Sequence, residues 1–374
     1  MPGIYIHIPF CKQACTYCNF HFSTTLTLKD KLLQAISKEI ALQKDYLQNE
    51  TIETIYIGGG TPSLLNAQEI NKIFEDLHQH FTIANDVECT IEANPDDLTH
   101  ANIQALRTTP INRFSIGIQS FTQADLRYMT RAHNAEQALQ CVPMVQDAGF
   151  DNISIDLIYG TPTLNDEDWI KNMEQAFQWN IAHISAYGLT VEENTALAHQ
   201  IKANKTQAPS EGKAKRQMLL LIEHMTKNGY IHYEVSNFAK PNQYSKHNSS
   251  YWLGKKYLGI GPSAHSYNTQ SRQWNIANNV KYIKSIAENK VPNEVETLTE
   301  SQKYNEYVMV SIRTIWGVDL EKVKQDFGEK YHRHLQKSST LFIKEKHAFL
   351  ENNNLRLTTS GILIADIITA ELFY

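Results

Sequence analysis

Three cysteines near the amino terminus are the residues of this chain best suited to chemistry. Cys11, Cys15 and Cys18 lie within the stretch IPFCKQACTYCNF, at positions 8–20. Only five cysteines occur in 374 residues, so their clustering points to a shared role. Thiolates are ligands of zinc and of iron–sulfur clusters. The spacing C-x3-C-x2-C therefore predicts a site for one of these groups.

The residues alone leave two kinds of site open. A structural zinc site would need a fourth ligand, which His21 could supply. A four-iron cluster usually takes four cysteines, so three thiolates leave one iron free for a substrate. The loop follows the first expected strand, where α/β folds place their active sites. The missing fourth cysteine and this placement favour the iron–sulfur cluster.

A glycine run, YIGGGTPS, follows the second expected strand and contains Gly58, Gly59, Gly60 and Thr61. Its simplest explanation is a tight turn that uses the positive φ of glycine. A phosphate loop fits poorly, because the G-K-[ST] lysine is absent. Glycines also let a ligand approach the backbone closely. Beside the cysteine loop, we favour a ligand-binding turn.

The third, fourth and fifth expected strands each carry a polar residue near the carboxyl end. These residues are Glu92, Gln119 and Asp156, and Arg131 follows the fourth strand. One buried charge in a strand is commonly an internal ion pair, because an unpaired buried charge is costly. Four such residues on successive units predict a polar rim around a ligand.

The elements that must position these residues are alternating strands and amphipathic helices. Asn66, Thr99 and Asn134 are expected helix N-caps, and Gly149 is an expected C-cap. Such βα units predict a parallel sheet, either open or an incomplete barrel unless two more strands lie downstream. The expected strands are Gly3–Pro9, Thr54–Ile57, Val87–Ala93, Arg113–Gln119, Asn152–Tyr159 and His183–Leu189.

The pattern changes after Thr190, and we expect three parts: 1–200, 201–296 and 297–374. The middle part has a helix near 213–228 and then a stretch, 230–279, with little periodicity. The last part ends in a strand, a turn at Ser360–Gly361 and a helix, which predicts a small, mainly helical or winged-helix-like domain.

The composition argues against a nucleic-acid-binding, a membrane-spanning and a secreted, disulfide-rich protein. The formal net charge is −5, so no overall positive field attracts nucleic acid, and no RNA-binding module stands out. No apolar run of roughly 18 residues and no signal-peptide pattern occur, and an odd, clustered set of cysteines does not indicate a disulfide framework. We expect a cytoplasmic protein.

The cysteine motif, with Tyr17 inside it, resembles the signature of the radical S-adenosylmethionine (SAM) superfamily. The resemblance implies a 4Fe–4S cluster on Cys11, Cys15 and Cys18, whose open iron binds SAM, and it counts Tyr17 among the cofactor-binding residues. It also implies reductive cleavage of SAM to a 5′-deoxyadenosyl radical.

The segments YIHIPF, IGGGTP and TIEANP are similar to the family of oxygen-independent coproporphyrinogen III oxidase (HemN) and its relative, the heme chaperone HemW. This family implies an incomplete (β/α)6 TIM-like barrel with a smaller C-terminal domain. It further implies that SAM contacts a set of residues: Tyr5, Gly59, Gly60, Thr61, Glu92, Gln119, Arg131 and Asp156.

Two features separate the branches of this family. Oxidases usually carry a further cysteine where this chain has Phe20, and they extend before the position of Tyr5. The segment HNSSYW resembles the motif in which the heme chaperones implicate a histidine, here His247; a packed, hydrogen-bonded histidine is the simpler explanation, and His265 is a weaker candidate. We therefore expect heme binding and delivery, with the decarboxylating oxidase as the alternative, so enzymatic activity is left open.

The resemblance also implies partners. These are heme or a porphyrinogen, an acceptor hemoprotein, and an electron donor such as flavodoxin or ferredoxin. Peripheral membrane contact and either a monomer or a cluster-dependent dimer are compatible with it.

Overall fold

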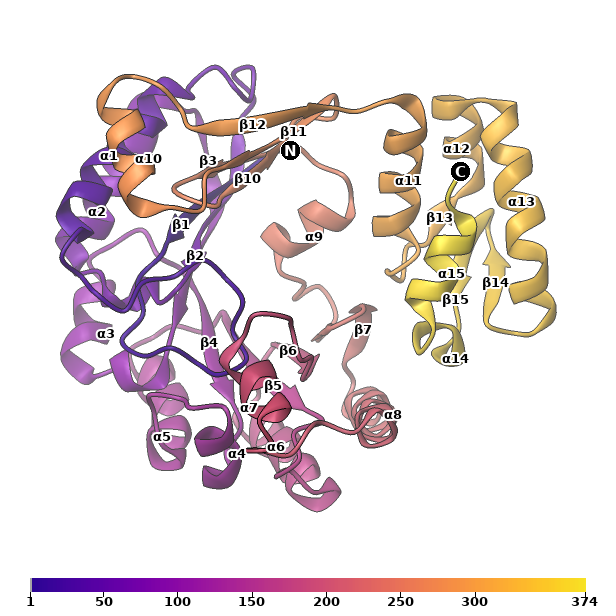
Figure 1. The fold of residues 1–374 in the computed structure, drawn as a ribbon, viewed down its shortest axis with the longest axis horizontal. Coiled ribbons are helices and arrows are strands. Elements are labelled where there is room, and N and C mark those ends of the chain that lie inside the picture. Colours follow the sequence, from indigo (N-terminus) through magenta and orange to yellow (C-terminus); the bar gives the residue numbers. More distant parts are fainter. Residues whose placement is uncertain (1) are drawn as a thin grey trace.

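Six parallel strands, each followed by helical structure, form the centre of the computed structural model, which describes residues 2–374 (Figure 1). Each strand pairs in parallel with the next, as the sequence predicts. The second and third strands are longer than expected. The strands are β1 (Gly3–Ile8), β2 (Ile52–Gly59), β3 (Ile83–Ala93), β4 (Arg113–Gln119), β5 (Ile153–Tyr159) and β6 (His183–Gly188).

The connecting helices cover the outer side of the curved sheet (Figure 1). The side chains of Asn66, Thr99 and Asn134 accept hydrogen bonds from the first turns of their helices, and Gly149 has φ +87° after a helix end. All four expected helix boundaries are confirmed. The helices are α1 (Lys29–Leu42), α2 (Ala67–His80), α3 (His100–Leu106), α4 (Gln123–Tyr128), α5 (Ala135–Asp147) and α6 (Asp166–Gln178), with short 3-10 turns at Pro62–Leu64 and Pro95–Asp97.

The two faces of the sheet differ in chemistry. Successive side chains of a strand point to opposite faces. On the helix-covered face, residues such as Ile4, Ile6, Ile55, Ile57 and Ile155 are fully buried in the main hydrophobic core. The alternate residues face inward and are mostly polar. The sequence thus builds an apolar outer layer and a polar interior.

Short strands extend the sheet on both sides. The stretch 230–279, in which the sequence shows little periodicity, contains several strands of three to five residues, which are too short to show a period. The order of the twelve strands is β12-β11-β10-β9-β1-β2-β3-β4-β5-β6-β8-β7, and within residues 2–374 the end strands do not pair, so the barrel is incomplete. These elements are α7 (Ala196–Lys202), α8 (Glu211–Lys227), β7 (Ile231–Glu234), β8 (Asn237–Ala239), α9 (Lys246–Trp252), β9 (Tyr257–Ile260), β10 (His265–Tyr267), β11 (Ser271–Asn275), α10 (Asn279–Ala287) and β12 (Asn293–Thr297).

The carboxy-terminal elements have a hydrophobic core of their own, which includes Tyr304, Leu335 and Ile368. A three-stranded sheet and helices build it, and the expected strand and helix at the end of the chain are present; the expected turn is the short helix α14. The boundaries 200/201 and 296/297 stay predictions. The elements are α11 (Glu300–Ser311), β13 (Val318–Asp319), α12 (Leu320–Phe327), α13 (Glu329–Lys344), β14 (Ala348–Glu351), β15 (Asn354–Leu357), α14 (Thr359–Ile362) and α15 (Ala365–Leu372).

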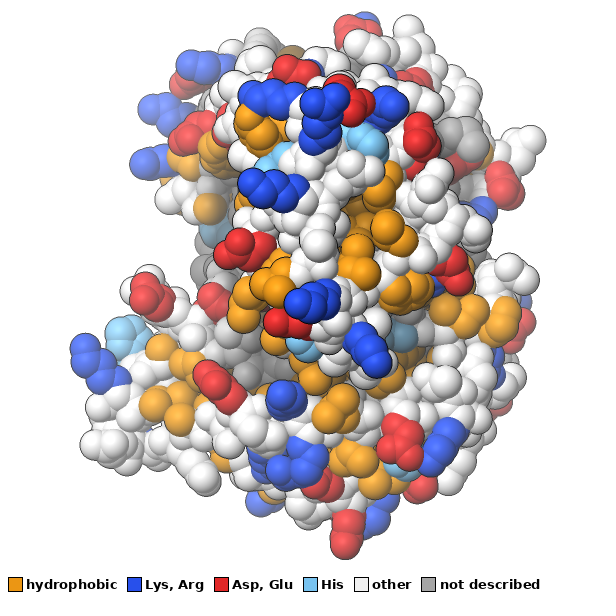
Figure 2. All heavy atoms as spheres, turned by 90° about the vertical axis from the view of Figure 1, so that its right-hand side faces the viewer, with side chains coloured by type: hydrophobic (Ala, Val, Ile, Leu, Met, Phe, Trp, Pro, Cys, Tyr) orange, Lys and Arg blue, Asp and Glu red, His pale blue; other side chains and the backbone are white. Residues whose placement is uncertain are grey.

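Acidic and basic side chains are interspersed on the face that carries these carboxy-terminal elements (Figure 2). Among residues 2–374, none of the helices combines the length and apolar character that crossing a bilayer requires.

A buried carboxylate joins α1 to the extension of the sheet. Glu39 is fully buried and accepts hydrogen bonds from the Gly261 N–H at 2.8 Å, Asn275 Nδ2 at 2.7 Å and the Tyr282 hydroxyl at 2.5 Å. Burial raises the pKa of the Glu39 carboxyl. A fourth, longer bond comes from Gln43 Nε2 at 3.4 Å. Because the other three donors lie beyond residue 260, this side chain holds the residue after β9, the end of β11 and α10 against the region of the first helix.

We expect Glu39→Ala to lower the free energy of unfolding by about 3 kcal/mol or more, since each buried donor left without an acceptor costs about 1–3 kcal/mol. Glu39→Gln keeps one acceptor oxygen and should cost less. Urea unfolding of the three proteins measures both values. A loss below about 1 kcal/mol in Glu39→Ala would contradict this role.

Candidate functional site

The cysteine loop begins at the carboxyl end of β1, as the sequence predicts. Its base is closed by two backbone hydrogen bonds, from Cys11 N–H to Ser23 O at 3.0 Å and from Ser23 N–H to Pro9 O at 2.8 Å. Cys11, Cys15 and Cys18 are free thiols with partial exposure. Among residues 2–374, no three cysteine, histidine or acidic side chains surround a single point closely enough for one metal ion. The ligand role of the thiols stays a prediction.

Arg131 ties this loop to the sheet. Its Nη1 lies 3.4 Å from Cys15 Sγ and 3.4 Å from the Tyr17 hydroxyl, while Nη2 donates to Asn94 Oδ1 at 2.6 Å and to Gly117 O at 2.9 Å. Burial raises the pKa of the Cys11 thiol to about 11. An adjacent guanidinium favours the thiolate form that binds metals. The donor set and its cation therefore fit a cluster held by three thiolates.

The glycine run packs directly against the start of the cysteine loop. Gly60 N–H donates to Ile8 O at 2.9 Å, and Thr61 N–H donates to Phe10 O at 2.6 Å. A Cβ on Gly60 would lie 2.6 Å from Phe10 O. Gly59 has φ +114°, and a Cβ there would lie 2.6 Å from the ring of His7. Packing alone thus requires both glycines, and their contact with SAM stays a prediction.

Two carboxyl groups lie above the inner face of the sheet. Glu92 accepts hydrogen bonds from the Tyr56 hydroxyl at 2.8 Å and from Gly59 N–H at 2.9 Å. Burial raises the pKa of Glu92 to about 7 and that of Asp156 to about 6. Ser115 Oγ donates to Asp156 Oδ1 at 3.5 Å. Both groups can therefore take up a proton near neutral pH.

Gln119 ends β4 in a left-handed conformation, with φ +64°, at an irregularity in the pairing with β5. Its side-chain amide packs against Gly117: a Cβ added to Gly117 would lie 2.9 Å from Gln119 Nε2. Tyr5 contacts His7 Nδ1 through its hydroxyl at 3.1 Å and stacks on Tyr56. Gln119 thus lies at the carboxyl end of its strand, as predicted, whereas Tyr5 lies in the middle of β1.

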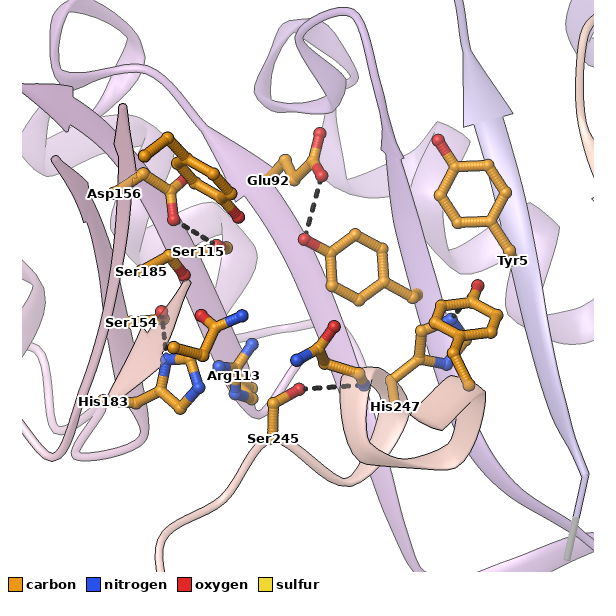
Figure 3. A pocket seen from close by; sticks show the side chains of 15 residues that line it. Tyr5, Glu92, Arg113, Ser115, Ser154, Asp156, His183, Ser185, Ser245 and His247 are labelled. Carbon is orange, nitrogen blue, oxygen red and sulfur yellow. Dashed lines mark hydrogen bonds between the residues drawn. The ribbon is translucent and has the colours of Figure 1, made fainter. Parts of the chain in front are cut away.

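The inner face of the sheet encloses a cavity of about 250 Å³ (Figure 3). Of the predicted site residues, it brings together Tyr5, Glu92, Asp156 and His247. The thiols, Gly59, Gly60, Thr61, Gln119 and Arg131 do not line it. The hydroxyls of Ser115, Ser154, Ser185 and Ser245 make much of its wall polar.

His247 lies on α9, inside the curve of the sheet, and only 2% of it is exposed. Its Nδ1 hydrogen-bonds with Thr54 Oγ1 at 2.8 Å, its Nε2 with the Tyr251 hydroxyl at 2.8 Å, and its ring stacks on Tyr56. Burial, followed by the charge of Arg113, lowers the pKa of His247 to about 3. The imidazole is neutral and both of its nitrogens have partners. His265 instead lies exposed on β10 and stacks on Trp274.

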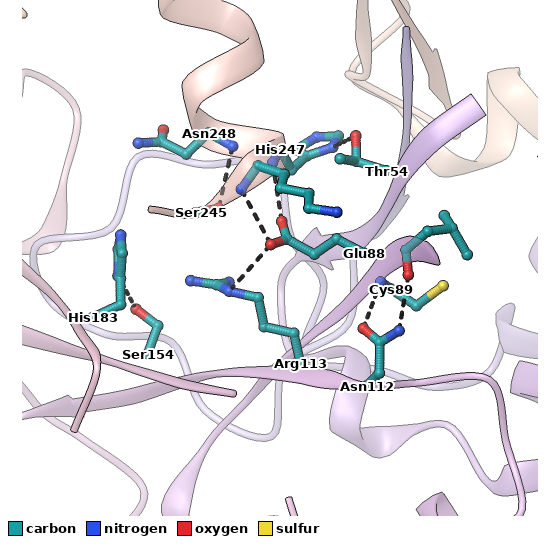
Figure 4. A network of polar contacts seen from close by, with 12 residues as sticks. Thr54, Glu88, Cys89, Asn112, Arg113, Ser154, His183, Ser245, His247 and Asn248 are labelled. Atoms are coloured by element: carbon teal, nitrogen blue, oxygen red, sulfur yellow. Dashed lines mark hydrogen bonds and ion pairs between the residues drawn. The ribbon is translucent and has the colours of Figure 1, made fainter. Parts of the chain in front are cut away.

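The sequence reasoning missed the residues at the amino ends of the strands. Glu88 and Arg113 form an ion pair there, with Oε2 and Nε 3.9 Å apart, and His183 hydrogen-bonds Ser154 at 2.7 Å (Figure 4). The available signal was the charge at the start of RFSIGIQ, a strand that is otherwise apolar. His21, the alternative zinc ligand, is engaged through Nε2 with Asn279 Oδ1 at 2.7 Å.

Comparison with known proteins decides the family. Residues 5–176 match the radical SAM superfamily, and residues 298–364 match the HemN C-terminal domain. A heme chaperone HemW of Lactococcus lactis is 32% identical over 357 residues, which is 96% of this chain and 93% of that protein. HemW of Bacillus subtilis is 31% identical over 90% of this chain and 88% of its own length. This chain belongs to the HemW family of radical SAM proteins.

A solved structure supports the fold. Coproporphyrinogen III oxidase HemN from Escherichia coli superimposes with a TM-score of 0.86 and 22% identity, over 100% of this chain and 90% of that one. The incomplete barrel and the smaller carboxy-terminal region expected from the family are confirmed. Membership of the radical SAM superfamily implies a 4Fe–4S cluster and SAM as cofactors.

Because the pKa of Glu92 is raised, we expect the free energy of unfolding to depend on pH. Between pH 4.5, its ordinary pKa, and about 7, the folded protein holds a proton that the unfolded chain has lost. Stability should therefore fall as pH rises through this window, and Asp156 adds a similar fall up to about pH 6. In Glu92→Gln the fall should be smaller, because a glutamine at this position does not titrate.

Denaturant unfolding between pH 4.5 and 8 measures this slope. Glu75→Gln, at an exposed position of α2, is the matched control and should follow the wild type. An unchanged slope in Glu92→Gln would show that the Glu92 carboxyl titrates at its ordinary pKa.

Proposed function

We propose that this protein binds heme and delivers it to acceptor hemoproteins. The observation that carries the proposal is the match, along nearly the whole chain, to proteins named heme chaperones. Neutral His247 on the wall of a polar cavity supports it. The proposal includes a cytoplasmic location and an electron donor of the flavodoxin or ferredoxin type.

In this proposal, Cys11, Cys15 and Cys18 hold the 4Fe–4S cluster, and Arg131 stabilises the thiolate of Cys15 from 3.4 Å. When bound, the cluster supplies one-electron reduction chemistry. The remaining predicted contacts hold SAM at the carboxyl ends of the strands. They are Tyr5, Tyr17, Gly59, Gly60, Thr61, Glu92, Gln119, Arg131 and Asp156.

His247 is the proposed heme ligand. Neutral imidazole is the form that binds iron, and the bond from Nδ1 to Thr54 would orient the ring. Binding through Nε2 requires that atom to give up its 2.8 Å bond with Tyr251. The cavity, about 250 Å³, lies below the roughly 300–1,000 Å³ of typical ligand pockets. The cavity is therefore too small for a macrocycle as it stands, and heme binding at His247 requires its wall to open.

The thiols provide the first test. After anaerobic reconstitution, the wild type should hold about four irons per chain and absorb broadly at about 400 nm. Cys15→Ala should lose both properties. Cys89→Ala, which removes a buried thiol of β3, should keep them. Retention of iron and absorbance in Cys15→Ala would exclude this residue as a ligand.

Heme titration and anaerobic turnover of coproporphyrinogen III separate the chaperone from the oxidase. We expect near-stoichiometric heme binding that weakens at least about tenfold in His247→Ala, because an axial ligand is lost. His265→Ala is the matched control and should bind as the wild type does. No decarboxylation should occur. Turnover of coproporphyrinogen III at enzymic rates would overturn the proposal in favour of the oxidase.

A further inference from the structure

Arg113, the first residue of β4, is a buried cation at the floor of the cavity. Only 2% of it is exposed, and its side chain lines the cavity between His183 and Ser245 (Figure 3). Within residues 2–374, its one acidic partner is Glu88, whose Oε2 lies 3.9 Å from Nε (Figure 4). That separation exceeds hydrogen-bond distance. The guanidinium therefore carries its charge with little direct compensation.

The carboxylate of Glu88 accepts hydrogen bonds from the backbone at the start of α9. Its Oε1 accepts a hydrogen bond from His247 N–H at 3.0 Å, and its Oε2 accepts one from Lys246 N–H at 3.1 Å. Both carboxylate oxygens thus serve the start of α9. A guanidinium has five N–H donors in a fixed fork, and burying such a group without acceptors is costly. The donors of Arg113 are available to a ligand in the cavity.

Apart from Glu88, the polar groups beside Arg113 are neutral. His183 hydrogen-bonds Ser154 Oγ at 2.7 Å and the Tyr233 hydroxyl at 2.8 Å, and burial lowers its pKa well below the usual value. The two carboxyl groups of the cavity, Glu92 and Asp156, lie toward its opposite end (Figure 3). The cavity is therefore polarised, with its acids at one end and its cation at the other. An anionic group entering it is stabilised at Arg113.

We propose that Arg113 is the receptor for a carboxylate on a short aliphatic arm, namely a propionate of the tetrapyrrole cargo. A guanidinium binds a carboxylate through two parallel hydrogen bonds. A space of about 250 Å³ accommodates such an arm but not a macrocycle. This inference rests on the proposed heme-binding function and adds to it the part of the cargo that enters the cavity.

The test compares heme with heme dimethyl ester, whose carboxylates are blocked, on the reconstituted full chain. The wild type should bind heme at least about tenfold more tightly than the diester. Arg113→Gln should bind the two equally, and Arg113→Lys should keep part of the preference. Arg127→Gln removes an exposed arginine of α4 and should behave as the wild type. Equal binding of both ligands by the wild type overturns the proposal.

A second measurement does not depend on heme. Sodium propionate should raise the midpoint of thermal unfolding of the wild type more than propionamide with matched sodium chloride does. Arg113→Gln should not show this difference. If heme does not bind but propionate stabilises only proteins that keep Arg113, the heme function fails while the carboxylate receptor stands. If propionate has no specific effect on the wild type, the receptor fails whatever heme does.

SAM also carries a carboxylate, so its binding is titrated beside these ligands. We expect Arg113→Gln to bind SAM as the wild type does. If that variant loses SAM binding and keeps its preference for heme over the diester, the carboxylate comes from SAM and the proposal is wrong.

Discussion

The alternation of side chains along the parallel strands is the constraint on which this structure depends. Because every second residue faces inward, the strands that bury isoleucines under the helices also line an interior with hydroxyl, imidazole and charged groups. Buried polar groups need partners. The interior satisfies many of them internally: Glu92 receives the Tyr56 hydroxyl, and His183 bridges Ser154 and Tyr233.

At the carboxyl ends of the strands, the cysteine loop and the glycine run are held close together. Backbone bonds join Gly60 and Thr61 to the residues just before Cys11, and no side chain larger than hydrogen fits at Gly60. The guanidinium of Arg131, which follows α4, links Gly117 of β4 to Cys15 and Tyr17. The loop is therefore placed by backbone packing at its base and by one half-buried cation beside Cys15.

The sequence predicted the features that repeat or cluster. Six strands, the caps at Asn66, Thr99 and Asn134, and the cysteine loop followed from local patterns that each extend over several residues. The extensions of the sheet did not, because β8 and β10 are three residues long and take their conformation from their neighbours. The charged pair at the cavity floor was missed. Glu88 and Arg113 come from distant segments, and only the fold brings them together and places Glu88 beside the backbone of His247, which the sequence did single out.

The same distant contacts couple the floor of the cavity to α9. Glu88 holds the backbone at the start of this helix, Thr54 holds the ring of His247, and Tyr251 closes the other side of that ring. A ligand that neutralises Arg113 removes the positive charge that faces Glu88 and His247. That change would weaken the ion pair of Glu88 with Arg113. Under the proposed carboxylate binding, a ligand on the cavity floor would therefore act on Glu88, the side chain that holds the start of α9.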